Sequence, residues 1–156
     1  MPDDDAVAAA DYRALAEFRH QIRRFLRFSE QAARAAGLEP QQHQALLALK
    51  GLPVEREPTV RELAERLQIR HHSAVELVNR LVERGLVDRS RAEGDRRRVL
   101  LRLSPAGEAL LGELSAHHLA ELRAVGPALV RALDALIAPP GTATRPAPPD
   151  DRGSRP

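Results

Sequence analysis

The sequence predicts a mainly α-helical chain that carries one small antiparallel β-hairpin. Two observations support this fold class. Apolar residues recur every three or four positions over most of residues 8–138, which is the period of amphipathic helices. Between residues 86 and 103, two short apolar runs flank a polar segment that contains Gly94, a pattern typical of a β-hairpin.

Start and stop signals divide the helical part into segments. Thr59 lies three residues before Glu62, the spacing of a capping box, and Ser104-Pro105 is a favourable helix start. Gly126-Pro127 is expected to break the last helical region into a long and a short helix. The predicted helices cover residues 8–36, 40–50, 60–67, 71–84, 105–125 and 129–137.

Length and composition narrow the class of protein. The 156 residues suit one domain with short extensions, and the absence of cysteine excludes disulfides and thiol catalysis. The acidic N-terminus is unlike an export signal and no apolar run is long enough to span a membrane, so we expect a cytoplasmic protein. No glycine-rich phosphate loop, nucleophile setting or metal-spaced carboxylate cluster is present, so we expect neither an enzyme nor a bound cofactor.

The two ends of the chain differ from its middle. Residues 1–7 are acidic and unpatterned, and we expect a flexible N-terminus. Residues 139–156 contain six prolines, and we expect a disordered tail.

The hairpin is rich in arginine. Residues 84–102 contain seven arginines and three acidic residues, whereas the whole chain has a net charge of only +2. Guanidinium groups on a projecting loop are suited to contacts with phosphates or with a minor groove. A merely hydrophilic surface hairpin is the alternative.

The two short helices before the hairpin are joined by the brief turn 68–70, which indicates a helix-turn-helix unit. The apolar positions of the second helix leave its other face for solvent or for a DNA groove. The candidate DNA-contacting residues on this helix are Arg70, His71, His72, Ser73, Glu76 and Arg80. Arg80 and Arg84 lie toward its end and suit phosphate contacts better than base contacts.

Two motifs resemble the MarR family of winged helix-turn-helix transcription regulators. Asp95-Arg96-Arg97, followed by residues 101–107 with the sequence Leu-Arg-Leu-Ser-Pro-Ala-Gly, is similar to the family's wing signature. Residues 77–87 are similar to the end of its recognition helix. The resemblance implies one domain over residues 8–138, with a DNA-binding lobe at 39–103 and dimerisation helices at 8–36 and 104–138. It also implies a homodimer that binds a pseudo-palindromic operator on double-stranded DNA.

The sequence departs from the family at the recognition helix. Arg70-His71-His72 stands where members usually carry a Ser or Thr cap. Glu76 stands where relatives often have a basic or small polar residue; it can accept from cytosine N4, but an i,i+4 pair with Arg80 is the interpretation we favour.

The wing residues have separate expected roles. We expect Arg97 to enter the minor groove, held by a bidentate hydrogen bond from its guanidinium to Asp95. The alternative is that these two side chains only pair across a solvated turn. The full set of candidate wing contacts to DNA is Arg91, Asp95, Arg96, Arg97 and Arg98, with Arg96 and Arg98 on phosphates.

Many MarR-like proteins release DNA when they bind a small aromatic or phenolic acid, which the resemblance implies here as well. The charged residues we expect around such an anionic effector are Arg19, His20, Arg23 and His43. Zinc sensing through His20, His43, His117 and His118 is an alternative, although adjacent histidines on a helix point about 100° apart and fit one metal poorly. The predicted function is a repressor released by an effector, and the alternative is a DNA-coating or anti-silencing protein of low specificity.

Overall fold

The computed structural model of the chain describes residues 7–137, with every side chain in that range except that of Arg96. The predictions for most of the N-terminal segment 1–7 and for the tail 139–156 therefore lie outside the described residues. The described elements, in chain order, are α1 (Ala9–Ala35), α2 (Pro40–Lys50), α3 (Val60–Leu67), α4 (His71–Glu83), β1 (Val87–Ala92), β2 (Asp95–Leu103) and α5 (Pro105–Ile137). The mainly helical fold with one two-stranded antiparallel sheet is confirmed.

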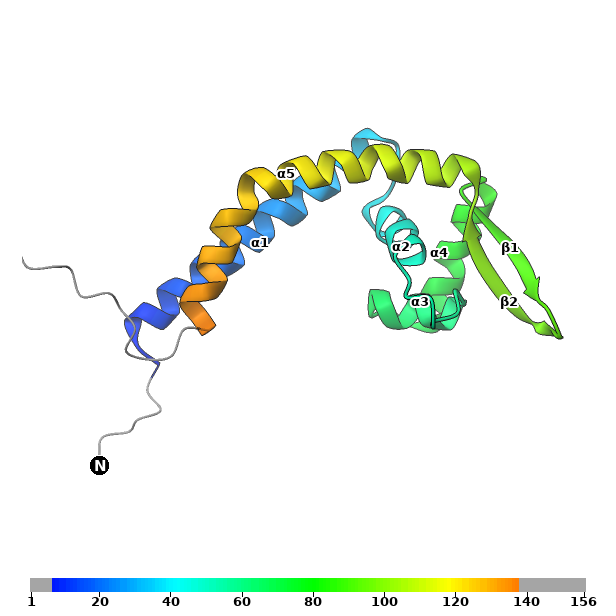
Figure 1. Cartoon of the computed structure of the whole chain (residues 1–156), viewed down its shortest axis with the longest axis horizontal. Helices are drawn as coiled ribbons and strands as arrows, with labels where there is room; N and C mark the ends of the chain where they lie inside the picture. Colours follow the sequence, from blue (N-terminus) through cyan, green and yellow to red (C-terminus); the bar gives the residue numbers. More distant parts are fainter. Residues whose placement is uncertain (1–6, 138–156) are drawn as a thin grey trace, which may run out of the picture.

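The chain has two parts (Figure 1). The first, which we call the arm, is α1 together with the length of α5 that packs along it. The second, which we call the lobe, contains α2, α3, α4 and the hairpin of β1 and β2. The pairing of α1 with α5 brings the start of α1 and the end of α5 to the same tip of the arm, far from the hairpin (Figure 1).

The predicted break at Gly126-Pro127 was wrong. Helix α5 continues through Pro127 and ends at Ile137, and Figure 1 shows it bending along the arm. Proline removes one backbone donor and clashes with the preceding turn, which costs about 3 kcal/mol in a helix interior. The helix continues because its last turns still pack on α1, where Ala132 is buried.

The core lies where the helices of the lobe meet the root of the hairpin and the start of α5. Its largest fully buried side chains are Leu38, Leu46, Leu63, Leu77, Leu81, Leu101, Val78 and Val87. At the start of α3, the Thr59 hydroxyl accepts from the backbone N–H of Glu62 at 3.2 Å, as the capping-box spacing predicts. The Glu62 carboxylate instead pairs with Arg56 and Arg66, so only half of the box forms.

The root of the hairpin is joined to α5 through Ser104 and Gly107. The Ser104 hydroxyl donates to the Gly85 carbonyl at 2.6 Å and accepts from the Gly107 N–H at 3.0 Å. A Cβ atom on Gly107 would lie 2.1 Å from the Leu86 carbonyl oxygen, so only glycine fits there. The Ser-Pro-Ala-Gly motif therefore fixes the wing to the long helix.

None of the helices in residues 7–137 combines the length and apolar character that a membrane span requires.

Candidate nucleic-acid interface

The face of α4 that points away from the core carries most of the residues that the sequence singled out. Arg70, His71, His72, Glu76 and Arg80 are exposed, and Ser73 is half-buried. The opposite face of the helix is buried through Ala74, Leu77, Val78 and Leu81. Arg70 caps the helix without any side-chain hydrogen bond, so the usual Ser or Thr cap is absent, as the sequence indicates.

The side chains of two arginines near the end of α4 have different neighbours from those expected. The expected pair between Glu76 and Arg80 was wrong, because no ion pair between them occurs among the described residues. Arg80 instead lines a surface hollow that Glu30 and Glu39 also border. The Arg84 guanidinium donates to the Gln42 side-chain oxygen at 2.8 Å. This bond links the end of α4 to α2, so the guanidinium already has a protein partner.

The tip of the wing has a different internal bond from the one predicted. Asp95 Oδ1 accepts from the backbone N–H of Arg97 at 3.0 Å, and no bond between the carboxylate and the Arg97 guanidinium occurs. The local bond forms because an Asp side chain reaches the backbone two residues later, as in an Asx turn. Asp95 therefore shapes the tip, and the exposed guanidinium of Arg97 makes no hydrogen bond or ion pair to a described residue.

The other arginines of the wing that the sequence suggested as DNA contacts lie in different surroundings. Arg91 is exposed on β1, and the side chain of Arg96 lies outside the described part of the chain. Arg98, expected on phosphate, forms an ion pair with Glu57 from the loop before α3. Its guanidinium is half-exposed, so a phosphate would have to displace Glu57 to bind it.

Two contacts that the sequence did not predict attach the wing to the helix-turn-helix unit. Arg89 on β1 donates to the Asn79 side-chain oxygen on α4 at 2.5 Å. On β2, the Leu101 N–H donates to the Pro58 carbonyl at 2.7 Å, near the pair of Arg98 with Glu57. The wing is thus held against both α4 and the loop before α3. No local pattern reveals these partners, because they lie 10 or more residues apart.

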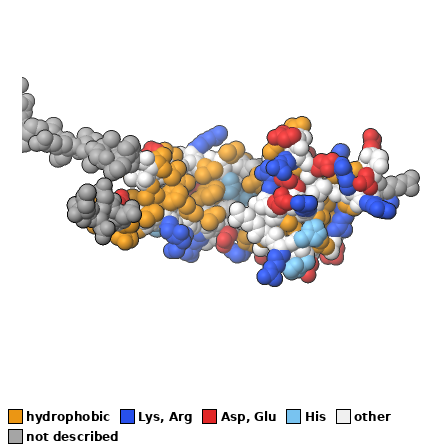
Figure 2. Space-filling model, turned by 90° about the horizontal axis from the view of Figure 1, so that it is seen from below, with side chains coloured by type: hydrophobic (Ala, Val, Ile, Leu, Met, Phe, Trp, Pro, Cys, Tyr) orange, Lys and Arg blue, Asp and Glu red, His pale blue; other side chains and the backbone are white. Residues whose placement is uncertain are grey.

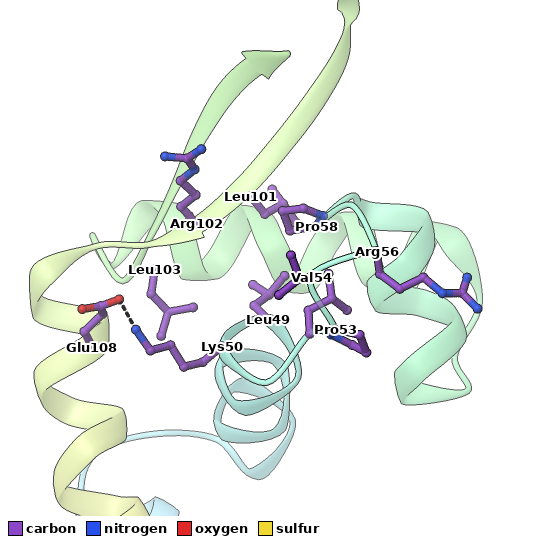
Figure 3. Close-up of a pocket in the computed structure, with 11 residues that line it drawn as sticks. Leu49, Lys50, Pro53, Val54, Arg56, Pro58, Leu101, Arg102, Leu103 and Glu108 are labelled. Carbon is purple, nitrogen blue, oxygen red and sulfur yellow. Dashed lines mark hydrogen bonds and ion pairs between the residues drawn. The ribbon is translucent and has the colours of Figure 1, made fainter. Parts of the chain in front are cut away.

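A shallow cavity of about 310 Å³ lies at the base of the hairpin (Figure 3). Its floor is apolar, from Leu49, Leu101 and Leu103, while Arg56 and Arg102 extend away from it (Figure 3). The Lys50 ammonium contacts the Glu108 carboxylate at 2.6 Å across its edge and so joins α2 to α5. This pair is exposed and contributes at most about 1 kcal/mol.

A larger cavity of about 590 Å³ lies where α1, α2 and α5 meet, at the joint between arm and lobe. His43 from α2 and His118 from α5 line it, and their rings stack with centroids 4.7 Å apart and planes 27° apart. Phe25 and Phe28 pack edge-on against His118. Both histidines are buried.

The hydrogen bonds of His118 define its tautomer. Its Nδ1 lies 2.6 Å from the Leu114 carbonyl oxygen, which can only accept, so Nδ1 carries the proton. Its Nε2 lies 2.8 Å from the Ser29 hydroxyl, which donates to it. Burial, and then the charge that His118 would carry, lower the pKa of His43 below 6.5.

Of the four residues expected around an effector, only His43 lines this cavity. Arg19, His20 and Arg23 are exposed on α1 and are not among the lining residues. His117, the neighbour of His118, is exposed and borders a different hollow. Within residues 7–137 no group of three or more His, Asp or Glu side chains is arranged to hold a metal ion.

Comparisons with known proteins agree with this arrangement. Residues 36–98, which include α2, the helix-turn-helix unit and most of the hairpin, match the sequence model of the MarR family. AbsC, a MarR family transcriptional regulator from Streptomyces coelicolor, superposes with a TM-score of 0.67 at 19% identity, covering 83% of this chain and 90% of that one. A comparison of the sequence with curated proteins found no match.

Two similar structures contain DNA. A mutant of MepR from Staphylococcus aureus bound to an oligodeoxyribonucleotide has a TM-score of 0.60 at 18% identity, covering 70% of this chain and 79% of that one. A mutant MarR from E. coli complexed with operator DNA has a TM-score of 0.56 at 20% identity, covering 72% and 76%. These likenesses establish the fold, and the sequence match to the MarR family model covers residues 36–98 of the chain.

Proposed function

We propose that this chain is a DNA-binding transcription regulator of the MarR family, whose sequence model matches residues 36–98. We further propose that it acts as a homodimeric repressor of a pseudo-palindromic operator. In this proposal α4 enters the major groove and the wing contacts the adjacent minor groove. A small aromatic or phenolic molecule releases the DNA.

The observation that carries the proposal is the bond between Arg89 and Asn79. This bond fixes the wing beside α4, so the exposed residues of α4 and the arginines of the wing belong to one surface. The guanidinium of Arg97 is exposed at the tip with no protein partner among the described residues, which suits insertion into a narrow minor groove.

The arm supports the dimer. Hydrophobic side chains gather over the arm, whereas charged side chains gather over the lobe and hairpin (Figure 2). The large exposed apolar residues of α1 and α5 are Tyr12, Leu15, Leu26, Leu119, Val130, Leu133 and Ile137. An apolar surface of this extent is unusual on a monomer. A second copy of the arm would cover it and would hold two lobes at the separation of two half-sites.

The large cavity supports the effector. It lies between the arm, which we assign to the dimer, and α2, which belongs to the DNA-binding lobe. A molecule that wedges between them would shift α2 against α5 and so change the distance between the two lobes. Effector binding would then lower the affinity for the operator by the same factor by which the operator lowers the affinity for the effector.

Footprinting on the DNA flanking the protein's own gene, at two salt concentrations, tests this function. We expect a short protected inverted repeat, and we expect Arg97→Ala to weaken protection by about tenfold or more because a groove contact is lost. Arg123→Ala, which removes an exposed arginine of α5 on the arm, is the matched control and should leave the footprint unchanged.

The same experiment separates the alternative function. Even, unpatterned protection of all DNA would indicate a coating protein of low specificity and would contradict the operator. Protection that Arg97→Ala and Arg123→Ala reduce equally would contradict the role of the wing.

A further inference from the structure

The cavity at the joint of arm and lobe has apolar walls and carries no full charge. Its lining residues come from α1, α2 and α5 and include no Lys, Arg, Asp or Glu. Leucine and phenylalanine side chains form most of the surface, and the polar groups are two serines, Gln44 and the two histidines. The volume of about 590 Å³ lies in the range that small-molecule sites occupy.

The two histidines do not replace the missing cation. Burial, and then the charge that His118 would carry, lower the pKa of His43 and disfavour a proton on it. The nitrogens of His118 are already used by the Leu114 carbonyl and the Ser29 hydroxyl. Charged residues of α1 near the cavity, such as Arg23 and Arg27, are exposed and do not line it.

His43 nevertheless offers one polar anchor. The residue is 4% exposed, and its side chain makes no hydrogen bond to a described residue. Among the described residues, every side-chain nitrogen or oxygen that is fully buried has a hydrogen-bond partner. His43 lines the cavity, so its ring nitrogens, which have no hydrogen-bond partner among the described residues, are the polar atoms that we expect a ligand there to reach.

We infer that this cavity selects an uncharged ligand, with a flat apolar body and one hydroxyl or amide group that bonds to His43, over the corresponding carboxylate. A carboxylate moved into such walls would lose its hydration without gaining a cation, which is strongly unfavourable, whereas a hydroxyl needs a single partner. This inference rests on the proposed effector site and specifies the chemistry of its ligand.

A matched pair of probes tests the inference on the full chain. 2-Naphthol and 2-naphthoate have the same ring system and differ in charge at pH 7.5, and calorimetry gives the affinity of each. We expect 2-naphthol to bind at least about tenfold more tightly than 2-naphthoate. His43→Leu should remove the anchor and weaken 2-naphthol by about fivefold to tenfold.

A second variant separates the two chemistries. Arg23→Ala, which removes a cation outside the cavity, should change the affinity for neither probe. Tighter binding of 2-naphthoate, with its loss in Arg23→Ala, would overturn the inference in favour of an anion site. Failure of both probes to bind would overturn it as well, and a footprint measured without any ligand would show separately whether the DNA-binding function stands.

Discussion

The carboxylate of Glu57, in the loop before α3, forms an ion pair with the guanidinium of Arg98 on β2. Both side chains are about half-exposed, so the pair is accessible to a competing anion. A DNA phosphate is such an anion, and Arg98 is one of the wing arginines of the proposed interface. The free protein therefore pairs one of its proposed phosphate-binding groups with a carboxylate of its own.

Glu57→Gln should strengthen DNA binding. In this variant Arg98 binds a DNA phosphate without first breaking an ion pair with Glu57. We therefore expect the DNA affinity to rise by about twofold to fivefold, the range of an exposed ion pair. The dependence of log K on log salt should steepen by up to about 0.9, the contribution of one phosphate. Fluorescence anisotropy over a salt series measures both quantities.

Two controls isolate the pair of Glu57 with Arg98. Glu55→Gln removes the same charge from the same loop, but Glu55 has no ion pair among the described residues, so its effect should be smaller. In an Arg98→Ala background, Glu57→Gln should lose most of its effect. Equal gains from both glutamine variants would mean that only overall charge matters.

Asp95 provides a test of the tip geometry. Its Oδ1 accepts from the backbone N–H of Arg97, and an asparagine side-chain oxygen can accept the same bond. Asp95→Asn should therefore keep DNA affinity within about threefold of the wild type, whereas Asp95→Ala should weaken it more because the Asx turn is lost. If Asn were as harmful as Ala, the carboxylate charge rather than the turn would be what matters.

Gly107→Ala should destabilise the fold strongly. The new Cβ would meet the Leu86 carbonyl oxygen at 2.1 Å, so the hairpin root and α5 would have to separate. We expect a loss of about 2–4 kcal/mol in the free energy of unfolding, in the range of overpacked sites. Urea denaturation measures it.

Gly112→Ala is the matched control in the same helix. A Cβ there meets nothing within 4 Å, so alanine should raise the free energy of unfolding by about 0.5–1 kcal/mol through its helix propensity. A similar loss in both variants would show that the space at Gly107 is not what constrains it.

The His43–His118 stack predicts a dependence of stability on pH. Because the pKa of His43 in the folded state lies below 6.5, the unfolded chain binds a proton that the folded chain rejects. The contribution to stability is complete above pH 6.5, and it is lost as the pH falls below that value toward the folded pKa. The free energy of unfolding should therefore fall on acidification.

His43→Gln removes this contribution and should flatten the decline of stability below pH 6.5. His117→Gln removes an exposed imidazole of α5 and serves as the control, because it should leave the decline in place. Denaturation curves from pH 5 to pH 8 distinguish the two variants. An unchanged decline in His43→Gln would place its cause elsewhere.

The elements that the sequence predicted well depend on local signals. Helix period, the Thr59 cap and the Ser104-Pro105 start each act within a few residues, and the helices and hairpin formed close to the expected positions. The break at Pro127 failed because packing of α5 on α1 outweighs a local penalty. A local helix-breaking signal is outweighed where the rest of the chain packs against the helix on both sides of the break.

The site was harder to predict than the fold because its bonds cross long stretches of chain. Arg84 with Gln42, Arg98 with Glu57 and His43 with His118 are pairs whose members meet only after the helices pack. A sequence pattern identifies which arginines and histidines are accessible to solvent, but not which acidic or polar group will hold them. Even between residues two positions apart the partner atom was not predicted, because Asp95 accepts from the backbone N–H of Arg97 and not from its guanidinium.

Selection of binding sites from random-sequence duplex DNA tests the central claim most directly, because it measures sequence preference and symmetry together. We predict enrichment of an inverted repeat whose half-site centres lie about 10 base pairs apart, one helical turn, with A·T pairs at the positions that the wings reach. Recovery of DNA without a consensus, or of a single half-site without its inverted copy, would contradict a homodimer that places two copies of α4 in successive major grooves.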